Sequence, residues 1–399
     1  PRCTHFGVCG GCKWQHLRYE KQLEFKEKQV IDNLTRIGKL ELSGVRPILG
    51  SSEIYGYRNK LEFTFSDKRW LTREEMLADN DRIVEDALGF HIPGYFDKVL
   101  DIRECHFQPD PSNAIRDSVR RYAHRKSLAF FNIRQQSGFL RNLIIRTTRS
   151  GNVMVIVVFF MYERERINGL MEHLRTEFPR ITSLYYIINT KKNDSLSDQV
   201  PVLYSGDDHL LEEIDSLKFR IGPLSFYQTN TLQAGKLYAI AKEFAGLTGR
   251  ETVYDLYTGA GTIACYVAGE AGKVIGMEYV DAAVEDAVIN SGINNIGNTE
   301  FYAGDIRLLL NEKFIQEKGR PDVIITDPPR AGMHSDVVEQ ILSAGPSRIV
   351  YISCNPSTQA RDAGLMSEKY RVAAVQPVDM FPHTHHVENV ILLERRRDK

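Results

Sequence analysis

The stretch Glu251-Thr-Val-Tyr-Asp-Leu-Tyr-Thr-Gly-Ala-Gly-Thr262 decides the fold class. It predicts a short apolar strand that ends in a glycine-rich turn and then opens a helix. Glycines in such a turn let the backbone approach a ligand, and the N-terminus of the helix offers unpaired N–H groups. Gly259, Gly261 and Ala264 fit the dinucleotide-binding pattern G-x-G-x-x-G/A. The stretch therefore indicates an adenosine-containing ligand, without distinguishing NAD from S-adenosylmethionine.

Strands and helices alternate around this turn. A helix at 232–245 precedes it, and the segments after it are predicted to alternate as strands and helices at 273–278, 281–291, 300–303, 322–326, 335–344 and 348–353. This alternation indicates a parallel sheet with helices on both faces. Two more strands are expected at 370–377 and 387–394. Residues 226–399 are thus predicted to form an α/β, Rossmann-like domain.

The chain before this domain has a different character. Residues 45–225 have the strand-and-turn pattern of a β-rich central domain, with a hairpin at Ser150-Gly151-Asn152, a helix at 163–178 and a polar, acidic surface insertion at 68–88. Residues 1–44 combine a Cys-rich loop with a helix at 15–38. The sequence therefore predicts three domains.

Composition excludes several classes of protein. With 42% hydrophobic and 26% charged residues, the 399-residue chain is neither disordered nor collagen-like. Its longest apolar run, 153–161, is far shorter than the roughly 18 residues of a membrane span. No secretory signal is visible, so a cytoplasmic protein is expected, and the missing initiator Met suggests a processed or truncated chain. The net charge of -1 means that any nucleic-acid binding must be local.

Two predicted strands end in acidic side chains. Glu278 lies 17 residues after Gly261, where a carboxylate can accept hydrogen bonds from ribose hydroxyls. Asp327 follows the strand 322–326 and precedes two prolines, which stiffen the loop. Because ligands of open α/β sheets bind at the carboxyl ends of the strands, both residues are candidates for ligand contact.

Cys354 ends the strand 348–353 beside the same edge. A lone cysteine is commonly a small buried hydrophobe, which is the interpretation of Cys265. The turn after Cys354 can supply N–H groups that favour a thiolate, so Cys354 is the predicted nucleophile. Glu388, at the start of the last strand, is its predicted carboxylate partner. Histidines at 383, 385 and 386 are predicted to lie in a solvated or RNA-facing loop rather than to bind metal.

A thiolate and a carboxylate beside a methyl donor suit methylation of uracil at C5, a carbon that is too weakly nucleophilic to react unaided. Addition of the Cys354 thiolate to C6 would form an enolate whose C5 attacks the sulfonium methyl group. Glu388 would then remove the C5 proton, and the thiolate would leave by elimination. In this hypothesis Cys354 is a covalent catalyst and Glu388 a general base.

Six motifs resemble, in order, those of RNA uracil-C5 methyltransferases of the RumA/TrmA type. They are Phe226-Tyr-Gln-Thr-Asn230, Asp255-Leu-Tyr-Thr-Gly-Ala-Gly-Thr262, Gly276-Met-Glu278, Thr326-Asp-Pro-Pro-Arg-Ala-Gly332, Ser353-Cys-Asn-Pro356 and His386-Val-Glu-Asn-Val390. The resemblance implies a class I S-adenosylmethionine (SAM)-dependent methyltransferase fold with Cys354 as nucleophile and Glu388 as base. It also implies that SAM is contacted or framed by the turn glycines and by Gln228, Tyr257, Thr262, Glu278, Asp305 and Asp327. Thr262 departs from the family pattern, because other members often have a different polar residue there.

Three cysteines, Cys3, Cys9 and Cys12, lie at the N-terminus, and Cys105 follows 93 residues later. Four thiolates suit either a [4Fe-4S] cluster or zinc, and the spacing alone does not choose. The resemblance to the RumA branch implies the cluster. The radical-SAM spacing C-x3-C-x2-C is absent, so the cluster is predicted to be structural or to help hold RNA. Because the tRNA-modifying TrmA branch lacks these cysteines, the resemblance implies 23S rRNA as the acceptor, bound by a monomeric enzyme.

RumA-like proteins often begin with a small β-barrel RNA-binding domain that has no counterpart in this sequence. This departure implies either a branch without that domain or a longer parent protein.

A local basic segment, 116–149, supports RNA binding. It contains nine Lys or Arg residues and one acid, Asp117, with Tyr122, Phe130, Phe131 and Phe139 interleaved. Basic side chains hold phosphates and aromatic faces stack on unpaired bases. The alternative is a solvated surface over core aromatics.

Three alternative functions remain open at this point. The chain could be a tRNA uracil-C5 methyltransferase, an NAD-linked iron–sulfur oxidoreductase or a non-catalytic RNA-binding protein. The sequence does not identify the target uridine or the number of sites.

Overall fold

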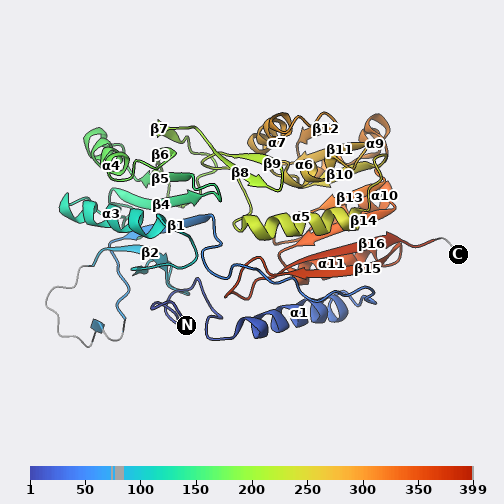
Figure 1. The fold of residues 1–399 in the computed structure, drawn as a ribbon, viewed down its shortest axis with the longest axis horizontal. Helices are drawn as coiled ribbons and strands as arrows, with labels where there is room; N and C mark the ends of the chain where they lie inside the picture. The colour runs from blue at the N-terminus through green and yellow to red at the C-terminus, as the bar shows by residue number, and fades with distance from the viewer. Residues whose placement is uncertain (73–74, 77–84, 398–399) are drawn as a thin grey trace. The chain divides into compact units, whose positions relative to one another are not determined.

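The computed structural model describes residues 1–72, 75–76 and 85–397 (Figure 1). The chain divides into two compact units: the first is Pro1–His16, Glu53–Glu212 and Ile221–Leu224, and the second is Leu17–Ser52, Glu213–Arg220 and Ser225–Lys399. The segment 1–44, which the sequence groups together, is thus shared between the two units. Much of the predicted insertion at 68–88 lies outside the described residues. Among those described, no helix has the length and apolar character needed to cross a membrane.

The first unit contains a seven-stranded sheet in the order β3-β2-β1-β4-β5-β6-β7. Its elements are β1 (Lys60–Ser66), β2 (Ala87–His91), β3 (Val99–Asp101), α3 (Ser112–Arg125), β4 (Leu140–Thr147), β5 (Val153–Phe159), α4 (Arg164–Glu177), β6 (Ser183–Ile188) and β7 (Val202–Gly206). The predicted hairpin joins β4 to β5, and α4 connects the parallel strands β5 and β6. One face of this sheet packs its core against α3 and α4.

The basic segment 116–149 does not form the stacking surface that its composition predicts. Its four aromatic side chains are at most 9% exposed, and three of them pack in the core under α3 and α4. Arg116 and Arg141 are fully buried as well. Arg141 donates hydrogen bonds to carbonyl oxygens of the 189–193 loop and lies over the ring of Phe131. The prediction is wrong for these residues, because they are buried among other side chains of the first unit and do not face solvent. Arg121, Arg125, Lys126 and Arg134 do remain exposed.

The second unit contains another seven-stranded sheet, in the order β12-β11-β10-β13-β14-β16-β15. Its elements are α1 (Tyr19–Arg36), α5 (Thr231–Ala245), β10 (Thr252–Leu256), α6 (Thr262–Ala268), β11 (Lys273–Glu278), α7 (Asp281–Ile293), β12 (Thr299–Ala303), α8 (Ile306–Leu309), α9 (Glu312–Lys318), β13 (Val323–Thr326), α10 (Ser335–Ala344), β14 (Arg348–Ser353), α11 (Pro356–Met366), β15 (Tyr370–Val378) and β16 (Glu388–Arg395). A separate pair of strands is formed by β8 (Leu210–Ile214) and β9 (Leu217–Ile221).

The strand order of this second sheet reverses beside β10. The chain runs outward from β10 through β11 to β12, then crosses to β13 on the other side, and these strands are all parallel. Only β16 runs antiparallel, between β14 and β15. Ligands of open α/β sheets bind where the strand order reverses, at the carboxyl ends of the strands. The start of β16 lies at this same edge because of its opposite direction.

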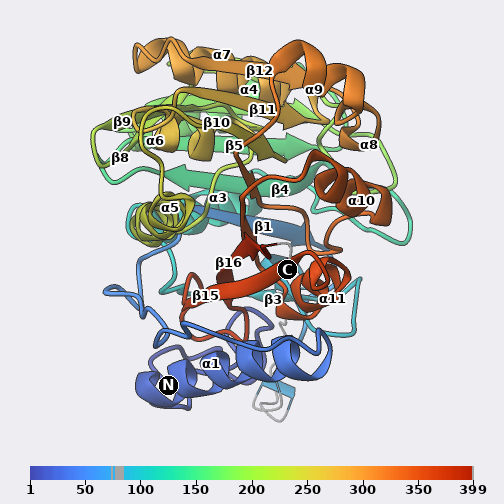
Figure 2. The same cartoon turned by 90° about the vertical axis from the view of Figure 1, so that its right-hand side faces the viewer.

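Helices cover both faces of the sheet, as the parallel pattern requires. The core on one face includes buried residues of α1, α10 and α11, and Figures 1 and 2 show α1 lying beside α11 and β15. The helix α5 packs against β13, β14, β15 and β16, and the helices α6 and α7 pack against β11 and β12. The N-terminal helix α1 is therefore part of the same core as the strands that end the chain.

Candidate active site

The glycine-rich turn after β10 has left-handed backbone at Tyr257, Gly259 and Gly261, with φ of 62°, 55° and 73°. Only glycine suits Gly261, because a Cβ there would lie 2.8 Å from the Cβ of Ala287. At Gly259 nothing lies within 4 Å of the position that a Cβ would occupy. The turn is thus packed from behind at Gly261 and open at Gly259, as a backbone that approaches a ligand must be.

Glu278 joins this turn to the end of β11. Its Oε2 accepts a hydrogen bond from the Gly259 N–H (3.0 Å), and its Oε1 accepts from the N–H groups of Tyr279 (2.8 Å) and Val280 (3.0 Å). A carboxylate has about four acceptor positions. Three backbone donors therefore fix the carboxylate and leave room for one hydroxyl donor.

Tyr257 and Asp305 lie near Glu278. Burial, then the charges of Asp362, Asp305 and Glu278, raise the pKa of Tyr257 to about 12. Asp305 caps α8 and accepts from both the backbone N–H and the Nε of Arg307, at 3.0 Å each. These hydrogen bonds hold the pKa of Asp305 below its usual range. Any ligand contact of Asp305 would be shared with Arg307.

Thr262 and Gln228 lie at or near the starts of two helices. Thr262 is the first residue of α6, and its Oγ1 lies 3.2 Å from the hydroxyl of buried Tyr238. Gln228 is half-buried and lies two residues before Asn230, the N-cap of α5. Both predicted residues therefore occur at helix N-termini of the second unit.

The register of the sheet brings Cys354 and Glu388 together. Ser353, the last residue of β14, pairs with Asn389 on β16. Cys354 and Glu388 adjoin this last pair, one on each chain segment, and the charge of Glu388 acts on the Cys354 thiol. Glu388 is only 4% exposed. Burial, followed by the charge of Asp327, raises the pKa of Glu388 well above its usual range.

Cys354 is surrounded by charge of both signs. Burial raises the pKa of its thiol to about 11, with further contributions from Glu388 and Asp327, while Arg330 opposes the shift by its charge and by a hydrogen bond. The sequence had predicted that backbone N–H groups would favour the thiolate. In the structure, burial and two carboxylates outweigh the single cation and raise the pKa of this thiol.

Asp327 lies between the two groups of residues. It follows β13, and burial together with the charge of Asp255 raises its pKa to about 7. Asp255 belongs to the strand under the glycine-rich turn and accepts from the Thr258 hydroxyl at 2.5 Å. Asp327 thus has electrostatic neighbours both at the turn and at the Cys354–Glu388 pair.

The loop that carries Arg330 is held by α11, a helix that the sequence pattern does not predict. Asn355 and Thr358 donate side-chain hydrogen bonds to the Arg330 carbonyl oxygen, at 3.0 and 3.2 Å. Buried Asp362 accepts from the Met333 N–H at 2.8 Å and from the Tyr351 hydroxyl at 2.7 Å. Arg330 stands in the quoted Asp-Pro-Pro-Arg motif, which was a usable signal. Nothing in the sequence pattern points to Asp362.

The loop before Glu388 differs from its prediction. His383 is 3% exposed, and its N–H donates to the Oε1 of Gln22 at 2.8 Å. Burial lowers the pKa of His383 to about 4, so it is a neutral internal side chain. The expectation of a solvated or RNA-facing position is therefore wrong for His383, because α1 covers it. Cys265, by contrast, is buried as predicted.

The four candidate metal ligands line one pocket of about 150 Å³ in the first unit. Cys3, Cys9, Cys12 and Cys105 are all free thiols, and apolar side chains such as Phe90 and Ile102 form part of the wall. Within the described residues, however, no group of three or more His, Cys, Asp or Glu is arranged to hold a metal ion. The two findings are compatible, because thiols can line the same pocket without pointing to a single position where a metal ion could bind.

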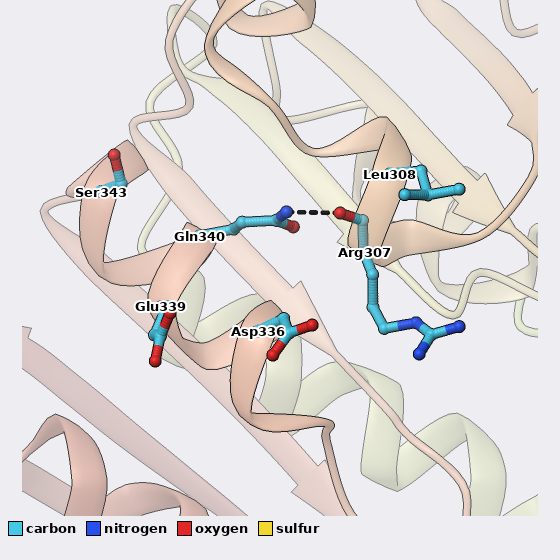
Figure 3. Close-up of a pocket in the computed structure, with 6 residues that line it drawn as sticks. All are labelled: Arg307, Leu308, Asp336, Glu339, Gln340 and Ser343. Carbon is cyan, nitrogen blue, oxygen red and sulfur yellow. Dashed lines mark hydrogen bonds between the residues drawn. The ribbon is translucent and has the colours of Figure 1, made fainter.

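A larger hollow of about 720 Å³ lies between α8 and α10. Figure 3 shows its lining residues, with the Gln340 side chain donating to the Arg307 carbonyl oxygen. None of the predicted cofactor or catalytic residues lines it. This open surface is therefore not assigned to the reaction.

Comparison with known proteins identifies the family. Residues 207–396 match the model of the tRNA (uracil-5-)-methyltransferases. A protein from Bacteroides thetaiotaomicron, named as an uncharacterized RNA methyltransferase, is 59% identical over 399 residues, which cover 99% of this chain and 88% of that protein. The chain belongs to the RNA uracil-C5 methyltransferase family. A similarly named protein from Chlorobaculum tepidum is 40% identical, with coverage of 99% and 83%.

A solved structure agrees with this membership. The crystal structure of the Pyrococcus abyssi tRNA (uracil-54, C5)-methyltransferase in complex with S-adenosyl-L-homocysteine matches this chain. The TM-score is 0.75 and the sequence identity is 30%. The match covers 97% of this chain and 86% of that one. The predicted α/β fold and family are confirmed, and the protein is an RNA methyltransferase. The oxidoreductase and the non-catalytic RNA-binding protein are therefore excluded.

Proposed function

We propose that this enzyme transfers a methyl group from SAM to C5 of a uridine in 23S rRNA, in the cytoplasm and as a monomer. The observation that carries the proposal is the strand pairing of Ser353 with Asn389, which brings the adjoining residues Cys354 and Glu388 close together at the edge where the glycine-rich turn lies. A nucleophile and a base must reach neighbouring ring atoms, C6 and C5, in the same bound uracil. Adjacent positions on paired strands provide that spacing.

The methyl donor would bind over the glycine-rich turn. Glu278 would accept a hydrogen bond from a ribose hydroxyl, since its carboxylate is fixed by three backbone donors and has one acceptor position left. Tyr257, Thr262, Asp305 and Gln228 would frame the rest of the molecule. The S-adenosyl-L-homocysteine in the Pyrococcus abyssi enzyme supports SAM as the donor.

The residues of the site then act in sequence on a uridine that is unpaired or flipped from its stack. The Cys354 thiolate adds to C6, and the electron pair of the C5–C6 bond moves to form an enolate. C5 takes the methyl group from the sulfonium, which leaves as the neutral thioether. Glu388 removes the C5 proton, and the resulting electron pair restores the double bond and expels the thiolate. Arg330, beside the sulfur, favours its ionised form.

The rate of adduct formation should depend steeply on pH. The thiolate is the reactive form of Cys354, and a pKa of about 11 leaves only about one thiolate in 10⁴ at pH 7. Between pH 7 and 9 we expect the rate to rise about tenfold per unit. Rapid-quench measurement with RNA that contains 5-fluorouracil follows this step alone. Arg330→Gln should lower the rate throughout, and a flat wild-type profile would show that the thiol is already ionised.

Substitution of Glu278 should weaken the binding of the methyl donor without weakening the binding of RNA. Loss of a charged hydrogen-bond acceptor costs about 1.5–3 kcal/mol, so Glu278→Ala should raise the dissociation constant of SAM about tenfold or more. RNA affinity should hardly change. Titration calorimetry measures both, with Glu285→Ala on the exposed side of α7 as the matched control. Unchanged SAM binding by Glu278→Ala would remove Glu278 from the site.

The N-terminal pocket fits a [4Fe-4S] cluster in its donor set, because four free thiols line one space and a cluster requires four thiolates. Cys3, Cys9, Cys12 and Cys105 would hold it, and it would fix the N-terminal loop to the segment around Cys105 within the first unit or help hold RNA. Because no metal-ready arrangement is present in the described part of the chain, binding would have to draw the thiols together.

Protein prepared without oxygen should be brown and contain about four irons per chain. Cys105→Ser should lose the visible absorbance and most of the iron, whereas the matched control Cys265→Ser, a buried cysteine on α6, should keep both. Metal analysis by mass spectrometry together with the absorption spectrum provides the measurement. One equivalent of zinc without iron would contradict the assignment.

The acceptor has a second candidate, a tRNA uridine, because the solved relative is a tRNA methyltransferase acting on uracil 54. The two are separated by mass spectrometry of rRNA and tRNA from a deletion strain, followed by methylation of transcripts in vitro. Loss of 5-methyluridine from 23S rRNA, with restoration on the purified fragment, supports the proposal. Methylation of tRNA transcripts alone would establish the second candidate instead.

A further inference from the structure

A fully buried ion pair joins the N-terminal helix to the segment before Glu388. The Nζ of Lys26 on α1 lies 2.6 Å from Oδ1 of Asp379, and both side chains are 0% exposed. Lys26 also donates to the Phe381 carbonyl oxygen at 3.0 Å. The other carboxylate oxygen of Asp379 accepts from the Tyr19 hydroxyl at 2.9 Å. Two residues about two turns apart on α1 thus bind the same acidic side chain.

A second contact from α1 holds the chain four residues further on. Gln22 accepts from the N–H of His383, and its Nε2 lies 3.1 Å from the Nδ1 of the same histidine. His383 has a φ of 65°, a left-handed backbone that is unfavourable for residues other than glycine. Such a conformation persists only where the surroundings impose it. Gln22 therefore contacts both the backbone N–H and the imidazole ring of the strained residue.

The sheet register connects this clamp to Glu388. Val378, the last residue of β15, pairs with Glu388, the first residue of β16. Asp379 therefore lies one residue from the partner of Glu388, and the segment 379–387 is the connection that delivers the chain into β16. A shift of this connection would move the start of β16, and with it the carboxylate that faces Cys354.

A buried ion pair is a poor way to gain stability alone. The cost of removing two charges from water often equals their attraction, so a well-packed apolar pair is commonly as stable or more so. An ion pair does impose direction, because its partners must meet in one geometry. We propose that Lys26 and Gln22 are positioning residues, which fix the segment 379–387 so that the Glu388 carboxylate stands where the C5 proton leaves. The inference rests on the proposed function of Glu388.

The test separates positioning from folding by removing both charges at once. Lys26→Met alone would leave a buried carboxylate without its cation, which is strongly destabilising. The double variant Lys26→Met/Asp379→Asn leaves no unpaired charge and should melt close to the wild-type temperature. Lys28→Met, on the exposed side of the same helix, is the matched control for the substitution. Gln22→Met removes the second contact without changing any charge.

With natural RNA, we expect the double variant to transfer the methyl group and then release RNA at least tenfold more slowly than wild type, so that a covalent complex accumulates. Its adduct formation with 5-fluorouracil RNA and its KM for SAM should stay unchanged. Gln22→Met should also release RNA more slowly and accumulate the covalent complex, and Lys28→Met should release RNA at the wild-type rate. The proposal would be overturned if the double variant and Gln22→Met both released RNA at the wild-type rate. It would also be overturned if adduct formation and RNA release were slowed equally.

Glu388→Gln, measured in parallel, separates this inference from the proposed function. If Glu388→Gln accumulates no covalent complex, the assignment of the base fails. If Glu388→Gln accumulates the complex and the α1 variants do not, only the positioning role of α1 fails.

Discussion

Replacement of Cys354 by alanine is expected to abolish methylation and to leave no covalent complex with RNA. Without the sulfur no bond forms to C6, so C5 never becomes nucleophilic enough to take the methyl group. Loss of a covalent nucleophile commonly costs a factor of about 10⁴ or more in turnover. A denaturing gel with labelled 5-fluorouracil RNA shows the complex directly, because fluorine at C5 cannot leave as a cation and wild-type enzyme stays attached.

The control is Cys265→Ala, the same substitution at a buried cysteine on α6. It should trap RNA as the wild type does. Peptide mapping of the shifted band should find the RNA on Cys354. A band that survives in Cys354→Ala, or one that maps to Cys265, would contradict the nucleophile assignment.

The substitution Glu388→Gln should fail at a later step than Cys354→Ala. The amide cannot accept the C5 proton, but it leaves the thiolate and the methyl donor in place. We therefore expect addition to C6 and methyl transfer to proceed on natural RNA, and elimination to stop with RNA attached. The attached product should already carry the methyl group, which tritium from labelled SAM reports within the shifted band.

Glu394→Gln provides the matched control, since Glu394 lies on the same strand and its carboxylate pairs with exposed Arg371 at the far end of β16. It should turn over normally. If Glu388→Gln forms a complex whose RNA is not methylated, the residue acts before methyl transfer. If the variant forms no complex at all, Glu388 is needed for the step in which the thiolate adds to C6.

Much of the C-terminal fold could be predicted because its signals are local. The bounds of β11, α10 and β14 agree with the sequence prediction residue for residue, since each is an apolar or amphipathic run between clear stop signals. The helix α11 was missed because it begins Pro-Ser-Thr-Gln, a stretch typical of loops. Its buried face becomes evident only when α1 and α10 pack against it.

The sequence predicts which residues belong to the candidate site, but it does not predict how the fold brings them together. Cys354 and Glu388 were each found as a reactive side chain at a strand end. Their juxtaposition depends on β16 inserting between β14 and β15, an order that no local pattern contains. The pairing of Lys26 with Asp379 joins residues 353 positions apart. Charge and spacing could not have shown that either of them is buried.

The place of α1 in the second unit has a consequence for synthesis on the ribosome. Lys26 is made 353 residues before Asp379. At about 5–20 residues per second, roughly 20 to 70 s pass between them. For most of that time α1 has no α11 or β15 to pack against, and Lys26 has no Asp379 to pair with. An unfinished chain therefore carries the glycine-rich turn and even Cys354 without a completed base, so catalytic competence arrives only once Glu388 and the strand that follows it have been made.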